Sequence, residues 1–288
     1  MMDERRPALS PDVFRLLRDF IYEFCGILFV DDQLFLLERR LWPRVEALTL
    51  TDFGDYLRYL RLCSPESRQV ELLEIAERVT TNETYFFRES YQLDAFSEEI
   101  LPEIHARRPR GKRLNIWSSA CSTGEEAYTI AILIHETGLF SDWDVRVFGS
   151  DISRRVLAVA RKGEYGHNSF RTTDAGFLRR YFREHNGKHQ IIDDIRHRCT
   201  FGHVNLVDSA MTRFVGEVDV VFCRNVLIYF DQRARRHVID MMHDKLVPGG
   251  YLLLGHSESL ITLSTAFELV HLRHDMVYRR PLERAHGA

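Results

Sequence analysis

The sequence predicts a helical N-terminal domain followed by an α/β domain with a mostly parallel sheet. Over the first hundred residues, apolar side chains recur at the 3.6-residue spacing of amphipathic helices. From residue 113 onward, short apolar runs alternate with helical stretches, a pattern typical of a parallel sheet with right-handed crossovers. A length of 288 residues agrees with two domains at roughly 150 residues each.

Composition and charge exclude several classes of protein. The 39 Lys and Arg residues nearly balance the 42 Asp and Glu residues, whereas a dedicated nucleic-acid-binding domain is strongly basic. The five cysteines include no C-x-x-C pair, which favours a reducing cytoplasm over a disulfide framework or a zinc ribbon. No apolar run approaches the about 20 residues of a membrane span. We therefore expect a cytoplasmic protein with no metal, no nucleic acid and no membrane insertion, and we expect a monomer.

Capping signals and apolar periodicity place four helices in the N-terminal domain. Ser10 followed by Pro11 is a typical helix start, and Gly26 closes the first apolar-periodic stretch. The other three helices are expected around residues 34–45, from Asp52, and from Ser64 to near Thr80. We assign residues 1–90 to this domain. Residues 91–112, which end in the basic stretch RRPRGK, are assigned to a connecting helix and linker.

The α/β domain is expected over residues 113–288. Strands are predicted at 114–120, 145–150, 218–223, 251–255 and 275–280, and helices at 125–137, 154–162 and 232–246. Residues at about 165–203 interrupt this alternation. Because Asn186-Gly187 is a typical hairpin turn between two short runs, we expect a small β insertion there.

The turn at Gly124 is the first candidate binding feature. A predicted strand runs into small residues, then Gly124, then a helix that starts with Glu125 and Glu126. Such a turn lets backbone N–H groups approach a ligand closely. The phosphate-binding version needs more glycines, and two carboxylates at a helix start repel a phosphate. The acid-lined turn favours a nucleoside ligand without phosphates, such as a cationic one, over a plain strand–turn–helix.

Asp151 ends the second predicted strand, 27 residues after Gly124. An acid at the tip of that strand can accept hydrogen bonds from ribose hydroxyls. The alternative is a helix N-cap, a role that either Asp151 or Ser153 suits.

Two further segments carry polar residues next to apolar ones. In TTNETYFFRE, Asn82 and Thr84 are candidate hydrogen-bonding residues and Arg88 is a candidate cation for a carboxylate. The alternative for this segment is a helix cap with a core aromatic pair.

The second segment, VVFCRNVLIYFD, is a strand that ends in Arg224 and Asn225. These residues would lie at the carboxyl edge of the sheet, where α/β proteins bind ligands. Tyr229 follows, either near the same cleft or in the core. Asn205-Leu206 ends another apolar run in the same way.

Six segments together resemble the CheR family of chemotaxis receptor methyltransferases. They are TTNETYFFRE, WSSACSTGEEAYTIA, FGSDIS with VLAVAR, FGHVNL, DVVFCRNVLIYFD and PGGYLLLGHSESL, and they appear in family order. The resemblance covers roughly residues 13 to 280. It implies a class I S-adenosylmethionine-dependent methyltransferase domain, Rossmann-like and with a small β-subdomain insertion. It also implies an all-helical N-terminal domain ahead of it.

Residue by residue, the resemblance implies a set of cofactor contacts. Glu126 and Asp151 match the acids that hold the amino-acid and adenosine parts of S-adenosylmethionine. Arg88 and Tyr229 match the catalytic positions closest to the transferred methyl group. The full set of implied cofactor-binding residues is Asn82, Thr84, Arg88, Glu126, Asp151, Asn205, Leu206, Arg224 and Asn225.

The implied reaction transfers a methyl group from S-adenosylmethionine to glutamate carboxylates on the cytoplasmic helices of chemoreceptors, for signalling adaptation. The products are glutamate methyl esters and S-adenosylhomocysteine. A glutamate carboxylate is already ionised at pH 7, so no general base is required. Catalysis then rests on alignment and desolvation of the carboxylate, with Arg88 orienting it and Tyr229 helping to position it.

The chain departs from the family pattern at two places. The second predicted helix mixes Arg39, Arg40 and Arg44 with several acids, whereas the family's helix is often strongly basic. The insertion is short and lacks the glycine-containing extension of members that tether a receptor C-terminal pentapeptide. We hypothesise that this chain needs no such tether.

Two other functions compete with the methyltransferase. One is a non-catalytic S-adenosylmethionine-binding module that regulates a partner. The other is an NAD-type oxidoreductase, which is disfavoured because only one glycine of the dinucleotide fingerprint is present.

Overall fold

The computed structural model describes residues 7–107 and 112–282. Most of the basic stretch predicted as a linker, residues 107–112, lies outside the described residues. The chain forms two units, of which the first contains residues 1–81 and 229–234, and the second contains residues 82–228 and 235–288. Among the described residues, no helix is long and apolar enough to cross a membrane.

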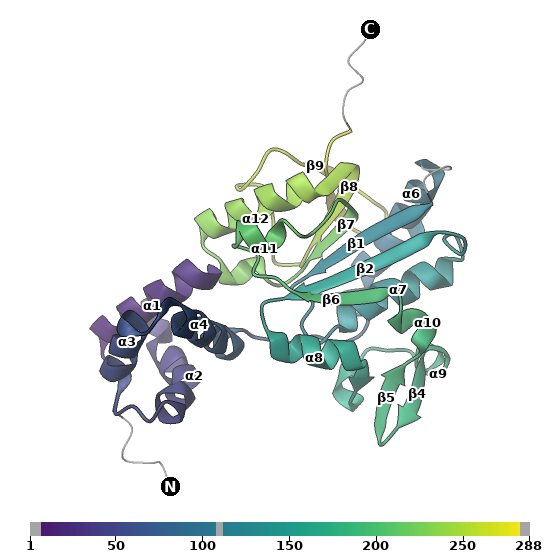
Figure 1. Cartoon of the computed structure of the whole chain (residues 1–288). Helices are drawn as coiled ribbons and strands as arrows, with labels where there is room; N and C mark the ends of the chain where they lie inside the picture. Colours follow the sequence, from purple (N-terminus) through teal and green to yellow (C-terminus); the bar gives the residue numbers. More distant parts are fainter. Residues whose placement is uncertain (1–6, 108–111, 283–288) are drawn as a thin grey trace. The chain divides into compact units, whose positions relative to one another are not determined.

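Four helices make up most of the first unit, each where the sequence predicts one (Figure 1). The hydroxyl of Ser10 accepts the N–H of Val13, and Gly26 ends the first helix with a left-handed φ of 73°. Asp52 and Ser64 cap the third and fourth helices in the same way. The helices are α1 (Pro11–Cys25), α2 (Leu34–Ala47), α3 (Phe53–Leu62) and α4 (Pro65–Val79).

A buried ion pair joins α2 to α4 within this unit. Arg44 donates two hydrogen bonds to the carboxylate of Glu71, at 2.9 and 2.6 Å, and the hydroxyl of Tyr56 on α3 donates a third at 2.6 Å. Glu71 is only 2% exposed. Because both carboxylate oxygens are paired, the charge is compensated, and removing one partner would leave an uncompensated buried charge. The network thus fixes the packing of three helices.

The segment 229–234 completes the first unit from far along the chain. Phe230 forms an antiparallel bridge with Ile27, and the carbonyl of Tyr229 accepts the N–H of Leu28 at 3.1 Å. The hydroxyl of Tyr22 donates to Asp231 at 3.0 Å. The assignment of residues 1–90 assumes a contiguous N-terminal domain. The first unit is instead built from two separate stretches of the chain.

Seven strands form the main sheet of the second unit, in the order β6-β2-β1-β7-β8-β10-β9. The strands from β6 to β8 run parallel, and β10 is antiparallel to both of its neighbours. This confirms the predicted mostly parallel sheet. The bounds are β1 (Arg113–Ser119), β2 (Asp144–Asp151), β6 (Cys199–His203), β7 (Val218–Cys223), β8 (Leu246–Leu254), β9 (Glu268–His271) and β10 (Met276–Arg279).

Helices cover both faces of this sheet. From β1 the chain proceeds through α7 and α8 toward the edge strand β6. From β7 to β8 it proceeds through α12 in the opposite direction. Right-handed crossovers in opposite directions place their helices on opposite faces, as Figure 1 shows for α7 and α12. The helices are α7 (Glu125–Thr137), α8 (Arg154–Lys162) and α12 (Gln232–Lys245), with short helices α9 (Ala175–Tyr181), α10 (Asp193–Arg196) and α11 (Ser209–Thr212).

The segment predicted as a connecting helix belongs to the core of the second unit. Its helices are α5 (Ser90–Ala95), a π-helical turn (Phe96–Ile100) and α6 (Leu101–Arg107). Phe96, Ile100 and Ile104 are buried in the same core cluster as residues of β1 and α7. The second unit accordingly begins at Asn82 rather than at residue 113, because this helical stretch buries its apolar face on the sheet.

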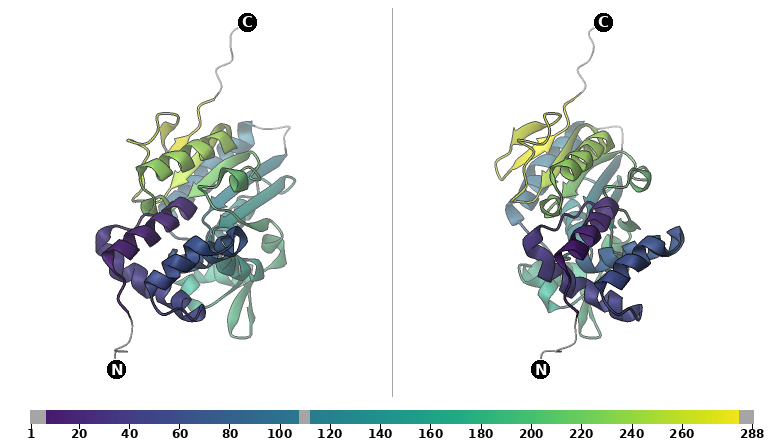
Figure 2. Two further views of the ribbon diagram at one scale, coloured as in Figure 1. Left: turned by 60° about the vertical axis from the view of Figure 1, so that its left-hand side comes forward. Right: turned by 90° about the vertical axis from the view of Figure 1, so that its left-hand side faces the viewer.

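A three-stranded sheet forms the predicted insertion, in the order β3-β5-β4. Its strands are β3 (Glu164–Tyr165), β4 (Phe182–His185) and β5 (Lys188–Ile191). Asn186 and Gly187 both have positive φ angles, as a two-residue hairpin turn requires, and the hairpin projects from the second unit (Figures 1 and 2). The predicted end of the insertion at residue 203 is too late. Cys199–His203 forms β6, which pairs with β2 in the main sheet.

Candidate cofactor-binding site

The candidate site lies where parallel strands of the main sheet end. Strands β1, β2, β6 and β7 end at Ser119, Asp151, His203 and Cys223, and parallel strands present their carboxyl ends at one edge of a sheet. The loops that follow these four ends contain most of the predicted site residues. The fold therefore brings together residues that are more than a hundred positions apart in the sequence.

The turn after β1 requires a glycine at position 124. Gly124 has φ +93°, and a Cβ atom there would lie 2.8 Å from the Cβ of Ala160 on α8. The carbonyl of Thr123 accepts a hydrogen bond from the hydroxyl of Tyr165 at 2.8 Å, which holds the turn on its other side. The absence of a side chain lets α7 begin close against α8, as the strand–glycine–helix pattern predicts.

Strained backbone is concentrated around this edge of the sheet. Seven described residues other than glycine have positive φ, and five of them lie in the segments that meet here. Each such residue costs of order 1 kcal/mol or more and persists only where its surroundings fix it, which is common at binding and catalytic sites. The five are Phe87, Glu89, Ala120, Ser122 and Asn225, with φ between 51° and 58°.

Asp151 is held at the end of β2 by two backbone donors. Its carboxylate accepts the N–H of Ser122 and the N–H of Ser153, both at 2.9 Å. The N-cap of α8 is Ser153, whose hydroxyl accepts the N–H of Val156 at 3.2 Å. Of the two candidate caps, Ser153 thus fills the role. Asp151 is tied instead to the loop after β1, where it faces the turn that carries Gly124.

Arg224 lies between two carboxylates, those of Glu126 and Glu89. Its Nη1 atom is 3.2 Å from Glu126 and its Nη2 atom is 3.1 Å from Glu89. Nη2 also donates to the carbonyl of Arg88 at 2.6 Å, and Ser118 donates to the other oxygen of Glu126 at 2.6 Å. The Arg224 side chain is only 3% exposed. Two carboxylates against one guanidinium leave a net negative charge in a protected position.

This charge balance fits a cationic ligand. Burial raises the pKa of Glu126 from its usual value, and the charge of Arg224 opposes that rise. An additional positive group would favour the ionised carboxylate further. The Nε atom of Arg224 is buried and has no hydrogen-bond partner among the described residues. A buried donor of this kind is uncommon, and it fits a ligand that accepts its hydrogen.

Glu125 faces away from this pair of carboxylates, although it precedes Glu126 directly. Its carboxylate accepts hydrogen bonds from Thr123 at 2.6 Å and from Ser169 at 2.9 Å. It is 2% exposed, and burial raises its pKa. Successive helical residues point in directions about 100° apart, so Glu126 reaches Arg224 and Glu125 reaches Ser169, in the 3-10 turn between β3 and β4.

The segment from Asn82 to Glu89 runs along the site. The carbonyl of Asn82 accepts the hydroxyl of Ser122 at 3.1 Å, which ties the segment to the loop after β1. The carbonyl of Arg88 accepts Arg224, as above, which ties it to the loop after β7. Arg88 itself donates to the carbonyl of Glu83 at 3.0 Å. Thr84 lies between these two attachment points in the sequence.

The loop after β6 lies next to Asp151. The N–H of Val204 donates to the carbonyl of Asp151 at 3.0 Å. Asn205 is 5% exposed and Leu206 is 7% exposed, and the Asn205 side chain accepts the N–H of Val207 at 3.3 Å. The structure thus places this predicted pair at the same edge of the sheet.

Two glutamates at the site were not singled out from the sequence. Glu89 pairs with Arg224. Glu258 accepts the backbone N–H groups of Asn225, Leu227, Ile228 and Gly255 at 2.7 to 3.3 Å, so one carboxylate holds the whole loop after β7. Both residues fall inside the quoted segments TTNETYFFRE and PGGYLLLGHSESL, but only the fold shows which backbone groups they bind.

Tyr229, the other predicted catalytic residue, belongs to the first unit. The structure places it at the end of the short 3-10 turn Leu227–Tyr229, where its carbonyl accepts the N–H of Leu28. Its catalytic role remains a prediction.

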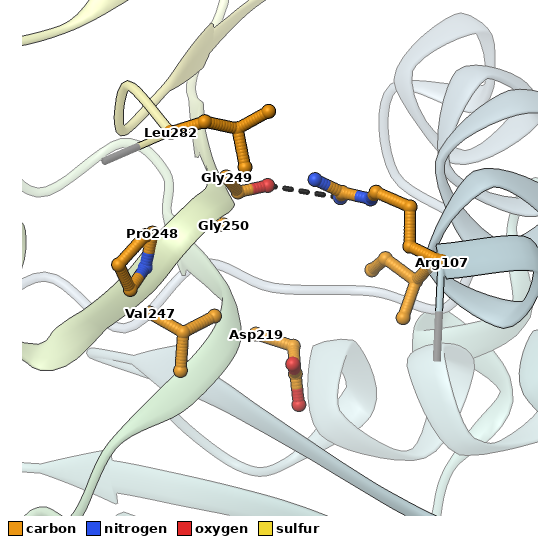
Figure 3. Close-up of a pocket in the computed structure, with 8 residues that line it drawn as sticks. Arg107, Asp219, Val247, Pro248, Gly249, Gly250 and Leu282 are labelled. Carbon is orange, nitrogen blue, oxygen red and sulfur yellow. Dashed lines mark hydrogen bonds between the residues drawn. The ribbon is translucent and has the colours of Figure 1, made fainter. Parts of the chain in front are cut away.

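A separate cavity of about 300 Å³ lies near the starts of β7 and β8 (Figure 3). It is lined by Arg107 and Asp219 among others, and Arg107 donates to the carbonyl of Gly249 at 2.9 Å. These residues lie toward the opposite ends of the strands from Arg224 and Asp151, so this cavity is not part of the candidate site. No group of three or more potential metal ligands occurs among the described residues.

The parallel sheet, the glycine turn and the acidic edge define an S-adenosylmethionine-dependent methyltransferase, and comparison with known proteins agrees. Residues 82–276 match the CheR methyltransferase SAM-binding domain, and residues 12–74 match the CheR methyltransferase all-alpha domain. The chain belongs to the CheR family.

Curated relatives cover nearly the whole chain. Chemotaxis protein methyltransferase 2 of Vibrio cholerae is 37% identical over 270 residues, which is 93% of this chain and 92% of that protein. Chemotaxis protein methyltransferase of Escherichia coli is 35% identical over 268 residues, 92% of this chain and 90% of the relative. Chemotaxis protein methyltransferase 1 of Pseudomonas aeruginosa is 34% identical over 272 residues, which is 92% of this chain and 97% of that protein.

Proposed function

We propose that the chain methylates glutamate carboxylates of chemoreceptors with S-adenosylmethionine as methyl donor. The observation that carries this proposal is the position of Arg224 between Glu126 and Glu89 at the carboxyl edge of a methyltransferase sheet. The relatives named above are chemotaxis protein methyltransferases, which supports receptors as the substrate class. The cytoplasmic helices of the receptors would be the partner, and the enzyme would act in the cytoplasm as a monomer.

The cofactor-binding residues follow the edge of the sheet. Glu126, with Arg224, would hold the amino-acid part of the cofactor, because an ammonium group restores neutrality there. Asp151 would accept the ribose hydroxyls, which agrees with its place at the tip of β2. The remaining contacts would come from the loops beside these residues, through Asn82, Thr84, Arg88, Asn205, Leu206 and Asn225.

Methyl transfer needs little acid–base chemistry from the chain. When bound, S-adenosylmethionine supplies an electrophilic methyl group on a positively charged sulfur. The receptor glutamate is ionised at pH 7 and supplies the electron pair for the new oxygen–carbon bond, while the carbon–sulfur pair stays with sulfur. Arg88 would orient the carboxylate and Tyr229 would help to position it, so catalysis is mainly alignment of reacting atoms.

The test is transfer of radiolabelled methyl groups to chemoreceptor-bearing membranes. We expect label on the receptors that is released by base, as a methyl ester is. Arg88→Ala should remove at least about 99% of the transfer and leave the thermal unfolding unchanged. Intact cofactor binding without label on any receptor would contradict the proposal and favour a non-catalytic binding module.

A further inference from the structure

Arg171 reaches the segment that carries Arg88, although it belongs to the region of the small sheet. It follows the 3-10 turn His167–Phe170. Its guanidinium carbon lies 3.8 Å from the ring centre of Tyr85, and its Nη2 atom lies 2.8 Å from the carboxylate of Glu83. Arg171 therefore stacks on one residue of the segment 82–89 and forms an ion pair with another.

Arg88 uses the same two residues. Its Nη1 atom donates to the carbonyl of Glu83 at 3.0 Å, and its guanidinium carbon is 5.7 Å from the ring centre of Tyr85. A ring held by one arginine offers a fixed surface to the other, because arginines stack on aromatic faces. The orientation of Arg88 thus depends on the ring of Tyr85 and on the backbone carbonyl of Glu83, and Arg171 contacts the side chains of both residues.

The backbone between these residues is attached to the same region. The N–H of Phe86 donates to the carbonyl of Ser169 at 2.9 Å, and the hydroxyl of Thr172 donates to the carbonyl of Phe86 at 2.9 Å. The neighbouring residues Phe87 and Glu89 both have φ of 58°. Strained backbone persists only where surrounding contacts determine it. Here residues 169–172 supply the contacts to Phe86, while Thr129 holds the N–H of Phe87 and Arg224 holds Glu89.

The contacts of Arg171 are not explained by a contribution to folding stability alone. Its side chain is 48% exposed and that of Glu83 is 63% exposed, and exposed ion pairs contribute little to stability. The effect expected from this arrangement is on the geometry of Arg88.

We propose that Arg171 is a positioning residue that orients Arg88 through Glu83 and Tyr85. The proposal rests on the role given to Arg88 under the proposed function. It makes the region around the small sheet part of the catalytic machinery, because that region sets the direction in which the proposed carboxylate-binding arginine points.

The first test compares Arg171→Ala with a matched control, Arg180→Ala. Arg180 also stacks on a ring, at 4.9 Å from the centre of Phe177, and lies 3.3 Å from the carboxylate of Glu136. It is 53% exposed, and its ion pair and ring contacts are with Glu136, Phe177 and Tyr181 rather than with the described residues 82–89. We expect Arg171→Ala to lower kcat for receptor methylation about tenfold, a cost typical of misplaced catalytic groups, while Arg180→Ala leaves kcat within about twofold. Equal effects of the two variants would overturn the proposal.

The second test asks whether Arg171 acts through Arg88. The affinity for S-adenosylhomocysteine can be measured by calorimetry without a receptor. It is compared between wild type, the two single variants and the double variant in a double-mutant cycle. Arg171→Ala should weaken binding about threefold or more in the wild-type background and have no further effect in the Arg88→Ala background. Arg171→Lys keeps the charge but loses the planar group that stacks, so it should restore only part of the affinity.

The two tests separate the inference from the function. If the wild-type chain binds S-adenosylhomocysteine but labels no receptor, the proposed function fails, and a non-additive cycle still supports the positioning role. If Arg171→Ala binds as tightly as wild type, or if its effect is fully additive with that of Arg88→Ala, the positioning role is wrong whatever the receptor assay shows. Unchanged thermal unfolding of both arginine variants confirms that folding is not the cause.

Discussion

Glu126 on α7 and Arg224 after β7 form an ion pair with an N–O distance of 3.2 Å, although 98 residues separate them in the sequence. The pair joins the two central strands β1 and β7 at their carboxyl ends. A second carboxylate, Glu89, lies on the same guanidinium. The pair is thus both a structural link and the source of the negative charge at the site.

We expect Arg224→Met to destabilise the protein by about 3 kcal/mol, because it leaves two partly buried carboxylates without their shared cation. Urea unfolding measures the change. Arg183→Met, at an exposed position on β4, is the control and should have almost no effect. A loss below about 1 kcal/mol for Arg224→Met would show that the pair behaves as an ordinary surface ion pair.

Glu125 should make stability depend on pH. Burial raises its folded-state pKa above the ordinary value of 4.5, so between those two values the unfolded chain releases the proton more readily than the folded one. Its contribution to stability is therefore present below the unfolded pKa and is lost as the pH rises toward the folded pKa. Glu125→Gln removes this titration. The difference in unfolding free energy between wild type and variant, from urea melts on both sides of pH 4.5, should shift in favour of the variant as the pH rises. A constant difference would contradict the assignment.

Glu258 is expected to be essential for the loop after β7. Glu258→Ala leaves four backbone N–H groups without their acceptor, at a cost of about 1–3 kcal/mol for each group that stays buried. We expect weaker binding of S-adenosylhomocysteine by at least about tenfold, because Arg224 and Asn225 lie in the same loop. Glu268→Ala, on the exposed edge strand, serves as the matched control for calorimetry. Wild-type affinity in Glu258→Ala would show that the loop after β7 keeps its conformation without this carboxylate.

Substitutions at two glycines with positive φ distinguish the effect of backbone strain from that of steric overlap. A Cβ atom at Gly124 would lie 2.8 Å from Ala160, whereas one at Gly138, also with positive φ, meets nothing within 4 Å. Gly138→Ala should cost about 1 kcal/mol of stability and leave cofactor affinity unchanged. Gly124→Ala should cost clearly more and abolish cofactor binding, because α7 and its turn must move. Equal stability losses in thermal unfolding would contradict the steric argument.

The short hairpin bears on receptor tethering. Strands β4 and β5 are joined by the two residues Asn186 and Gly187 alone, without the longer glycine-containing extension. We expect no tight binding of an isolated receptor C-terminal pentapeptide in calorimetry. Tight binding would disprove the hypothesis that this chain needs no tether.

Local sequence signals predicted the elements well where caps and apolar runs are strong. The bounds of α7, α8 and β7 agree with the predicted 125–137, 154–162 and 218–223. The predictions failed where the decisive interaction is distant. The strand Cys199–His203 looked like part of the insertion, because only its pairing with β2 shows that it belongs to the main sheet. Edge strand β9, mostly exposed, has too weak a pattern to be predicted.

The site shows the same division between local and distant information. Motif position was enough to select Glu126, Asp151 and Arg224, because Glu126 lies in the first turn of the helix after β1, Asp151 ends β2 and Arg224 directly follows β7. It could not distinguish the directions of Glu125 and Glu126, or identify Glu258 as the acceptor for the loop of Asn225. Those assignments depend on side-chain direction and on contacts between segments far apart in the chain.

The helical unit also imposes an order on synthesis. Its last pieces, Tyr229–Ala234, leave the ribosome long after Thr81, by on the order of ten seconds at ordinary translation rates. Until then Ile27 has no strand partner and Tyr22 has no acceptor at Asp231. The nascent chain must therefore make most of the second unit before these last contacts of the first unit can form.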